Sequence, residues 1–506
     1  MDVLSNLAHG FTVAVQPLNL LVAFIGCFFG TVIGALPGIG PVNGIAILIP
    51  LAFSLDLSPV SALILLTSVY YGTMFGGRIA SILLNIPGDA AAVMTCIDGY
   101  PMARKGRAAD ALATSAISSF FGGTLATIGL TILAPTLALA AIYFGPREYF
   151  ALYVMAIVVI GGVASGNPAK TLIAGLLGLT IGTVGIDAGS GVPRFTFGAY
   201  ELYEGIDFVI VAIGLFAISE FLMFIEQRRN GAVEQFPVGT RTTALRKLTY
   251  PGTSLRSGLL GFVVGVLPGA GATLASFLGY MLEKRVMNKN DTFGKGDPRG
   301  VAAPEAADNA AAGGSLVPML TLGVPGSGTT AIMLGMLITL NVQPGPLLFE
   351  RQPEIVWGLV AALYVSNIIL LILNIPLVGI FARLLTVPTH YLMPGIVVVS
   401  FLGVYSMNQS AFDLILMVGF GAFGYVLRKL GVPLVPVILG IILGSPMEQS
   451  LRRALTASGG DVMTLFESPL AVALHIVTAC FIAIAVVREV RRRMNGTAPL
   501  REAEID

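Results

Sequence analysis

Apolar runs close to or longer than 20 residues recur along the whole chain, and they constrain its fold more than any other feature. A helix needs about 20 apolar residues to cross a bilayer. The chain is 55% hydrophobic and 11% charged, whereas soluble domains carry about 25% charged residues. Alternating strand patterns are absent, and only helices and closed barrels satisfy their backbone inside lipid. The sequence therefore predicts an all-α polytopic membrane protein.

The apolar runs predict about eleven to thirteen crossings together with broken segments. The clearest spans are 17–36, 148–166, 168–186, 206–226, 258–281, 391–408, 410–427 and 464–487. Runs 108–144 and 354–387 are too long for one upright crossing at about 1.5 Å per residue. Each of these predicts two helices or one long tilted helix. Runs 41–55 and 432–445 are short and flanked by proline and glycine.

Two of the apolar regions are interrupted in the same way, by "GALPGIGPVNG" at 34–44 and "GVLPGAGATLA" at 265–275. At a constant offset Gly34, Leu36, Pro37, Gly38 and Gly40 match Gly265, Leu267, Pro268, Gly269 and Gly271. A second pair follows in the same order, "GGRIASILLNIPGDAAAVM" at 76–94 and "GGSLVPMLTLGVPGSGTTAIM" at 313–333. Paired broken segments in an internal repeat are typical of secondary transporters.

The repeat divides the chain into four parts. The predicted parts are a first half, 1–226, with the motif 34–44 and a hairpin 70–98; a polar basic linker, 227–257; a second half, 258–487, with the motif 265–275 and a hairpin 305–340; and a tail, 488–506. The tail contains "REVRRRMNG", and by the positive-inside rule it is cytoplasmic.

A broken membrane helix frees backbone N–H and C=O groups, which survive only where protein or a wet cavity surrounds them. Exposed helix N-termini suit carboxylates, and exposed C-terminal carbonyls suit Na⁺. A lone "LPG" is commonly a kink or a close-packing point, but two matched pairs flanked by hydroxyl and amide side chains indicate a binding site. Pro37, Gly38, Pro268 and Gly269 are predicted to break helices, and Pro87, Gly88, Pro325 and Gly326 to form two hairpin tips.

The predicted ligands come from these four motifs. Substrate is predicted to contact Arg78, Ser81, Asn85, Pro87, Gly88, Pro325, Gly326, Ser327, Thr329 and Thr330. Na⁺ is predicted to contact Gly38, Gly40, Asn43, Gly269, Gly271 and Thr273, because hard cations prefer oxygen ligands. No covalent cofactor is expected.

Arg78 is the most unusual charge, because it stands among small and apolar residues. An intramembrane arginine marks a functional site or a salt-bridged structural residue. Glu305 and Asp308 either help to bind a cation or begin a solvated helix, and Asp89 and Asp98 flank the first hairpin in a similar way.

Several function classes are excluded by the sequence. The net charge of +1 argues against a nucleic-acid partner. "GVPGSGTT" has a threonine, Thr329, where a phosphate-binding loop needs lysine. The three histidines are scattered, and no catalytic residue set appears, so no catalytic residue is assigned and an enzyme is not expected. The three cysteines show neither disulfide nor metal spacing.

Three stretches carry a family resemblance: "GALPGIGP", "YYGTMFGGRIASILLNIPGDAAAVMTCIDGYPMARKGRA" and "PEAADNAAAGGSLVPMLTLGVPGSGTTA". Over nearly the whole chain the sequence resembles the large membrane subunit of tripartite tricarboxylate transporters, the TctA type. The resemblance implies a bacterial inner-membrane importer of citrate or other carboxylates, driven by an ion gradient, usually Na⁺. It also implies a small four-helix membrane subunit and a periplasmic solute-binding protein as partners. Similarity to other ion-coupled carboxylate carriers suggests inverted repeats, two re-entrant hairpins and elevator-type movement.

The chain departs from the family pattern at two positions. The family more often has a small hydroxyl residue where Arg78 stands, and an asparagine where Asp308 stands. An added cation near the first hairpin favours a substrate with an extra or differently placed carboxylate. An alternative function is a channel or passive pore for small anions, but a pore needs a continuous polar lining. A scaffold without transport leaves the matched breaks unexplained.

Overall fold

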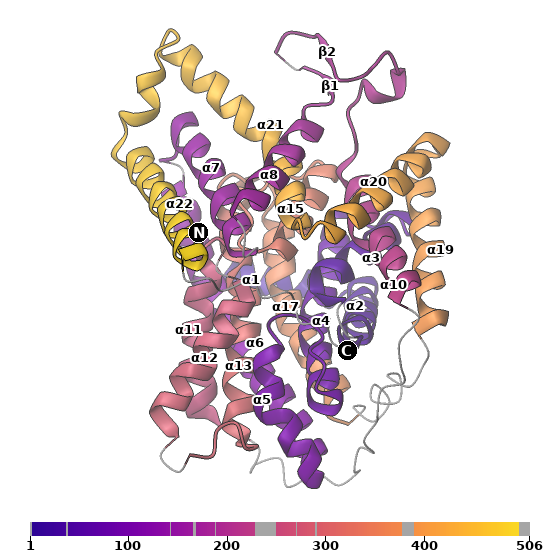
Figure 1. Ribbon diagram of the computed structural model, residues 1–506, viewed down its shortest axis with the longest axis vertical. Coiled ribbons are helices and arrows are strands. Elements are labelled where there is room, and N and C mark those ends of the chain that lie inside the picture. Colours follow the sequence, from indigo (N-terminus) through magenta and orange to yellow (C-terminus); the bar gives the residue numbers. More distant parts are fainter. Residues whose placement is uncertain are drawn as a thin grey trace. The chain divides into compact units, whose positions relative to one another are not determined.

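The computed structural model describes residues 3–36, 39–141, 143–164, 168–187, 189–227, 249–269, 271–288, 291–376 and 389–494. Helices make up almost all of its regular structure (Figure 1). In these ranges the strands are the two-residue pair β1 (Gly185–Ile186) and β2 (Pro193–Arg194), which run antiparallel. The prediction of an all-α protein is therefore confirmed.

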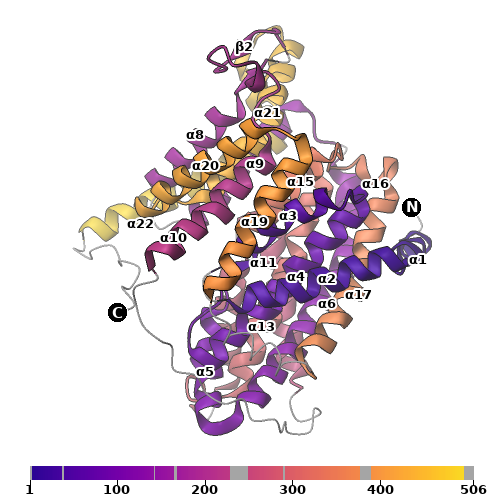
Figure 2. The same ribbon diagram turned by 90° about the vertical axis from the view of Figure 1, so that its right-hand side faces the viewer.

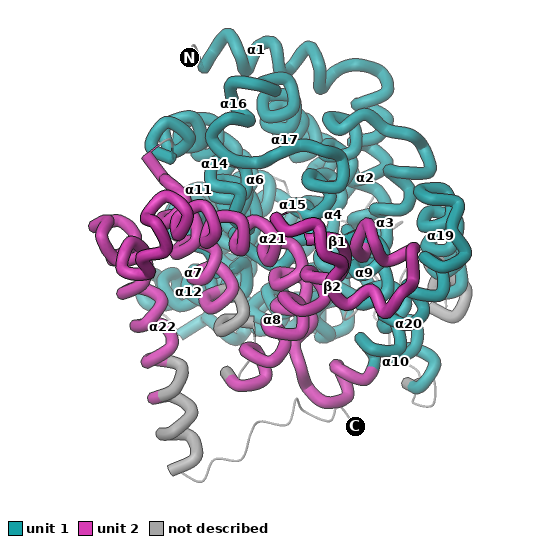
Figure 3. Tube along the Cα trace, turned by 90° about the horizontal axis from the view of Figure 1, so that it is seen from above, with its two compact units in different colours: residues 1–142, 207–425 teal, residues 143–206, 426–506 magenta. Residues whose placement is uncertain are grey.

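The chain folds into two compact units (Figure 3). Unit 1 comprises Met1–Ile142 and Asp207–Tyr425, and unit 2 comprises Tyr143–Ile206 and Val426–Asp506. Both interrupted motifs and both predicted hairpins belong to unit 1. The compact units thus follow a different division from the predicted parts at 1–226 and 258–487, which rest on the sequence repeat alone.

Unit 1 contains the helices that surround the four motifs. They are α1 (Val3–Ala14), α2 (Pro17–Ala35), α3 (Gly40–Ser54), α4 (Pro59–Leu84), α5 (Val93–Met102), the π-helical turn η1 (Ala103–Arg107), α6 (Ala108–Ala141), α9 (Phe208–Ala212), the π-helical η3 (Ile213–Ile218), α10 (Ser219–Gln227), α11 (Pro251–Val266), α12 (Gly271–Met287), α13 (Pro298–Gly314), α14 (Leu316–Leu322), α15 (Gly328–Thr339), α16 (Leu348–Arg351), α17 (Pro353–Asn374), α19 (Thr389–Asn408) and most of α20 (Ala411–Lys429).

Unit 2 is built on α7 (Pro146–Ala164), α8 (Pro168–Gly182), α21 (Leu434–Ala457) and α22 (Pro469–Met494), with the short 3-10 helices η2 (Tyr200–Leu202) and η5 (Val462–Phe466). α21 packs against α7 and α8. The β1–β2 hairpin is tied to α21 by ion pairs from Arg194 to Glu448, 3.0 Å, and from Arg452 to Asp187, 3.1 Å.

Seven of the described helical stretches are long and apolar enough to cross a membrane, and five shorter apolar helices accompany them. The chain is thus a multi-pass membrane protein, while the predicted number of crossings stays a prediction. Run 108–144 is one long helix, α6. Run 354–387 begins with α17, and its part 377–388 lies outside the described residues.

Two predicted boundaries are wrong. The span predicted over 258–281 is two helices, because α11 ends at Val266 and α12 begins at Gly271. The proline and glycine of the second interrupted motif lie between these two helices. The break that this motif predicts is therefore present, and a continuous helix over 258–281 is not. The linker predicted over 227–257 is shorter, because α11 already begins at Pro251.

The helices that carry the motifs pack through glycine in both halves of the sequence. α2 packs on α4, and α11 packs on α13 (Figure 2). A Cβ added at Gly34 would lie 2.3 Å from the carbonyl oxygen of Thr73, and one added at Gly265 would lie 2.3 Å from that of Ala311. Small residues allow such close approach of membrane helices. The glycines that end α2 and α11 therefore set the helix separation beside each break.

We expect Gly265→Ala to destabilise unit 1 by about 1–3 kcal/mol, because the methyl group would push α11 away from the backbone of α13. The measurement is the thermal unfolding of the detergent-purified protein. Gly419→Ala is the matched control, because Gly419 lies in α20 and an added Cβ meets nothing within 4 Å. Equal unfolding temperatures for both variants would show that the α11–α13 contact is not tight.

Candidate functional site

The second interrupted motif and the second hairpin tip are hydrogen-bonded to each other. Gly269 lies in the break between α11 and α12 with φ +85°, and its N–H donates to the carbonyl of Gly326, 3.0 Å. Pro325 and Gly326 form the buried turn between α14 and α15. A Cβ at Gly326 would lie 2.7 Å from the carbonyl oxygen of Ser315. The predicted break and the predicted hairpin tip are thus both present in this half, and the hydrogen bond from Gly269 to Gly326 joins them.

The side chains of this tip cap the helix that follows it. The hydroxyl of Ser327 accepts the N–H of Thr330, 3.2 Å, and the hydroxyl of Thr330 accepts the N–H of Ser327, 2.8 Å. This capping box fixes the start of α15. Thr329 and Thr330 are buried, and Ser327 is half-buried. A helix N-terminus with hydroxyls around it attracts negative charge.

The first tip packs against the end of α2. α4 ends at Leu84, and Asn85 follows in the left-handed conformation with φ 57° and is exposed. Gly88 is so close that an added Cβ would lie 2.6 Å from the carbonyl oxygen of Gly34. Pro87 is half-buried in the same turn. Pro37 and Gly38, predicted to break the chain here, lie outside the described residues.

Tyr70, on α4, contacts a residue beside the second tip. Its ring is buried, and its hydroxyl is 3.4 Å from the hydroxyl of Ser315. A Cβ added at Gly326 would lie 2.7 Å from the carbonyl oxygen of Ser315, so Tyr70 lies close to the second tip. Helix α4 also leads into the first tip, so it brings together two tips that are more than 200 residues apart in the sequence.

A second contact joins the halves on the other side of the first tip. The hydroxyl of Ser276, on α12, donates to the carbonyl of Ala91, 2.7 Å. Ser81, in contrast, donates to the carbonyl of Gly77 on its own helix, 3.0 Å, and is buried on α4.

Four of the residues predicted to bind Na⁺ lie at the starts of two helices: Gly40, Asn43, Gly271 and Thr273. Gly40 and Gly271 each begin a helix with φ +65°. Asn43 is buried on α3 and donates from its amide to Glu220 of α10, 3.3 Å. Glu220 is a carboxylate that the sequence motifs did not single out. Thr273 is exposed on α12. Within the described residues no group of three or more His, Cys, Asp or Glu side chains could hold a metal.

Arg78 forms buried ion pairs with two carboxylates of α13. It lies on α4, 1% exposed, and pairs with Glu305 through Nε and with Asp308 through Nη2. Glu305 also accepts hydrogen bonds from Thr95 of α5 and from Ser119 of α6, the latter at 3.0 Å. Both carboxylates are 1% exposed on α13, so the prediction that they begin a solvated helix is wrong.

The two positions that depart from the family pattern are thus in contact with each other. The guanidinium of Arg78 contacts the carboxyl group of Asp308 through Nη2. Arg78 also lines a cavity of about 10 Å³ with Ser115 and Asn374, which is space for about one water molecule.

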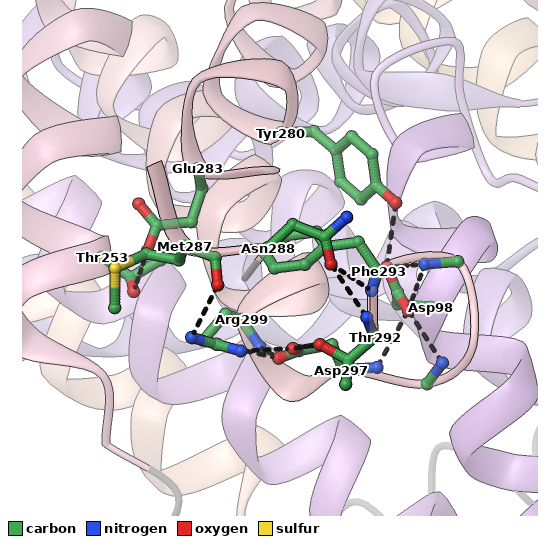
Figure 4. A network of polar contacts seen from close by, with 12 residues as sticks. Asp98, Thr253, Tyr280, Glu283, Met287, Asn288, Thr292, Phe293, Asp297 and Arg299 are labelled. Carbon is green, nitrogen blue, oxygen red and sulfur yellow. Dashed lines mark hydrogen bonds and ion pairs between the residues drawn. The ribbon is translucent and has the colours of Figure 1, made fainter. Parts of the chain in front are cut away.

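A further buried carboxylate, Asp98, joins α5 to the loop before α13 (Figure 4). It accepts the N–H groups of Gly294, 2.8 Å, Gly296, 2.8 Å, and Asp297, 2.9 Å, and the hydroxyl of Tyr280, 3.0 Å. Helix α5 carries Thr95, and α13 carries Glu305, so this contact also holds together the helices around Arg78.

Asp297 caps the N-terminus of α13 in the same loop, and its carboxylate accepts the N–H of Arg299, 2.9 Å. Burial alone would raise the pKa of Asp297, but hydrogen bonds from Arg299 and Thr292 outweigh it and lower that pKa below its ordinary value. The glycines of "FGKGDPRG", whose backbone can turn toward a carboxylate, are a weak sequence signal for this loop.

Comparison with known proteins agrees with these features. The sequence profile of the tripartite tricarboxylate transporter TctA family matches residues 20–439. An uncharacterized 52.8 kDa protein in the TAR-I ttuC' 3'region of Agrobacterium vitis is 42% identical over 498 residues, which are 98% of each chain. An uncharacterized protein in the TAR-II ttuC' 3'region of the same organism is 39% identical over 235 residues, 46% of this chain and 97% of that one. No solved structure is significantly similar to the chain.

Proposed function

Because the chain belongs to the tripartite tricarboxylate transporter TctA family, we propose that it is the large permease subunit of a binding-protein-dependent secondary importer of di- or tricarboxylates. A Na⁺ gradient drives the import, and the permease works by elevator-type alternating access. The observation that carries this proposal is the pairing of each described tip with the end of a broken or terminating helix, together with the hydrogen bond from Ser276 of α12 to Ala91 beside the first tip.

The proposed substrate site uses the polar groups of the two tips. A carboxylate that enters the membrane loses water, and that loss is prohibitive unless other donors replace it. Backbone N–H groups and hydroxyls of 85–90 and 324–330 supply such donors. Arg78 supplies a permanent charge with a bidentate fork. Its acidic partners hold it in the present structure, and they release it when a substrate carboxylate binds.

The proposed partners and location follow from the family. A tripartite system requires a solute-binding protein and a small membrane subunit with four helices. The permease then lies in a bacterial inner membrane with its C-terminal tail in the cytoplasm, because several arginines lie at the C-terminal end of α22.

We expect replacement of Na⁺ by choline, at constant pH, to slow solute uptake at least severalfold. Carbonyl oxygens around 38–43 and 269–273 are the proposed Na⁺ ligands, and choline is too large for such a site. The measurement is uptake by proteoliposomes that contain both membrane subunits, with the loaded binding protein outside. A thermal-shift screen of carboxylates against the binding protein first identifies the solute. Equal rates of solute uptake with Na⁺ and with choline would show that Na⁺ is not the coupling ion.

The same vesicles distinguish a carrier from a channel or passive pore for small anions. A coupled carrier accumulates solute above the outside concentration while the Na⁺ gradient lasts, whereas a pore only equilibrates it. Accumulation that survives collapse of the membrane potential but not of the ion gradient supports the importer. Equilibration alone, at any gradient, supports the pore.

A further inference from the structure

The charges around Arg78 do not balance. One guanidinium faces two carboxylates, Glu305 and Asp308, and all three side chains are 1% exposed. They lie within the buried contact of α4, α5, α6 and α13. An uncompensated negative charge in such a place is strongly unfavourable. When two carboxylates share one site, the proton affinity of one of them rises. The cluster therefore requires one more positive charge.

The hydrogen bonds indicate which carboxylate remains charged. Glu305 accepts from Arg78, Thr95 and Ser119, and such donors stabilise the ionised form. Asp308 contacts Nη2 of Arg78 through Oδ2. Its Oδ1 is buried and has no hydrogen-bond partner among the residues that the structure describes. A proton on Oδ1 displaces no existing donor, and it leaves Arg78 and Glu305 as a neutral pair.

From this geometry we propose that the Arg78–Glu305–Asp308 cluster is a proton-binding site, with the proton on Asp308. Cys96 on α5 is a titratable neighbour of the cluster, and within the described residues Arg78 is the cation that pairs with Glu305 and Asp308. Asp98, also on α5, is held by the loop amides at 294–297 and not by Arg78. The cation that balances the cluster is thus a proton and not a neighbouring side chain.

A proton at this position couples to substrate binding, and this step rests on the proposed function. A neutral Asp308 holds Arg78 less strongly than an ionised Asp308. A substrate carboxylate that competes for Arg78 therefore binds better to the protonated permease. By linkage the substrate then raises the proton affinity of the cluster by the same factor. The proton becomes a second coupled ion beside Na⁺.

Infrared spectroscopy of the purified full chain tests the proton without any substrate. A protonated carboxyl group has a C=O stretch above the amide bands, and this band shifts in heavy water. We expect such a band in the wild type and its loss in Asp308→Asn. Glu305→Gln is also expected to remove the band, because Asp308 then forms a one-to-one ion pair with Arg78. Asp308→Glu is expected to keep the band at a changed frequency.

Glu283→Gln is the matched control. Glu283 is buried and pairs one-to-one with Arg256, 2.7 Å, with Thr253 as a further donor. This carboxylate has one guanidinium of its own, so its replacement is expected to leave the carboxyl band unchanged. A wild-type spectrum without a protonated carboxyl band, or a band that persists in Asp308→Asn, would overturn the proposal. Neither result depends on transport. The proton-binding site can therefore be disproved without disproving the proposed importer function, and the reverse also holds.

The coupling has its own readout. A carboxylate that stabilises the wild-type permease against heat is expected to do so more in acidic than in alkaline buffer. In Asp308→Asn the stabilisation is expected to be the same in both buffers, because the amide mimics the protonated acid at every pH. The same pH dependence in both proteins would overturn the coupling.

Discussion

Arg78→Ser is expected to lower the free energy of unfolding by about 3–5 kcal/mol, because it leaves the buried carboxylate of Glu305 without its cation. Glu305 and Asp308 are 1% exposed on α13, so water cannot replace the guanidinium unless the helices separate. Arg78→Lys keeps the charge but cannot contact both carboxylates through a fork. Its expected loss is therefore smaller. The measurement is the amount of folded protein in the membrane together with thermal unfolding in detergent.

The double variant Arg78→Ser with Glu305→Gln is the decisive control. It removes the guanidinium together with the carboxylate that the proposed proton leaves ionised. We expect it to recover most of the stability that Arg78→Ser loses. The opposite outcome is that Arg78→Ser is as abundant and as stable as the wild type, and that only its half-saturation concentration for substrate rises. Arg78 then binds the substrate directly, and its ion pairs with the acidic residues have no structural role.

The breaks and tips could be predicted from the sequence because proline and glycine act locally. Pro268 and Gly269 separate α11 from α12, and Pro325 and Gly326 turn the chain between α14 and α15, as the motifs indicate. Proline lacks the N–H that an inner turn of a helix needs, and glycine accepts positive φ. These properties hold whatever the rest of the chain does. The matched pairs then located the candidate site without knowledge of its neighbours.

The partners of the charged residues could not be predicted in the same way. Arg78 and Glu305 are 227 positions apart, and only the packing of α4 on α13 brings them together. Helix α13 is buried on every side, so its sequence shows no polar stripe that would mark a facing helix. The amide of Asn43 likewise contacts Glu220 of α10, which lies 177 positions away, and its role as a Na⁺ ligand stays a prediction. Side-chain neighbours depend on tertiary packing, which local patterns do not encode.

Asp98 shows how one carboxylate can support the whole site. Its four hydrogen bonds come from three backbone N–H groups and one hydroxyl, and all of them belong to α12 or to the loop before α13. A carboxylate that accepts several N–H groups is held firmly in position. Because α5 also carries Thr95, which bonds Glu305, the Asp98 contact sets the distance between α5 and the Arg78 cluster.

Asp98→Ala is expected to cost roughly 2–4 kcal/mol of stability, because it leaves loop N–H groups and Tyr280 without their acceptor. Tyr280→Phe removes only one of the four donors, so its expected loss is about 1 kcal/mol. Asp291→Ala changes an exposed aspartate of the same loop that pairs with Lys295, and little change is expected. Thermal unfolding in detergent ranks the three variants.

A local readout decides whether Asp98 acts through α5. Cys96 lies two residues before Asp98 and is partly buried, whereas Cys480 is exposed. In a Cys480→Ser background, a maleimide should label Cys96 faster in Asp98→Ala than in Asp291→Ala, because α5 loses its attachment to the loop before α13. Faster labelling with normal unfolding temperature would confine the effect to α5. Unchanged labelling and unchanged stability in Asp98→Ala would show that the loop finds other acceptors for its N–H groups, and that Asp98 does not position the cluster.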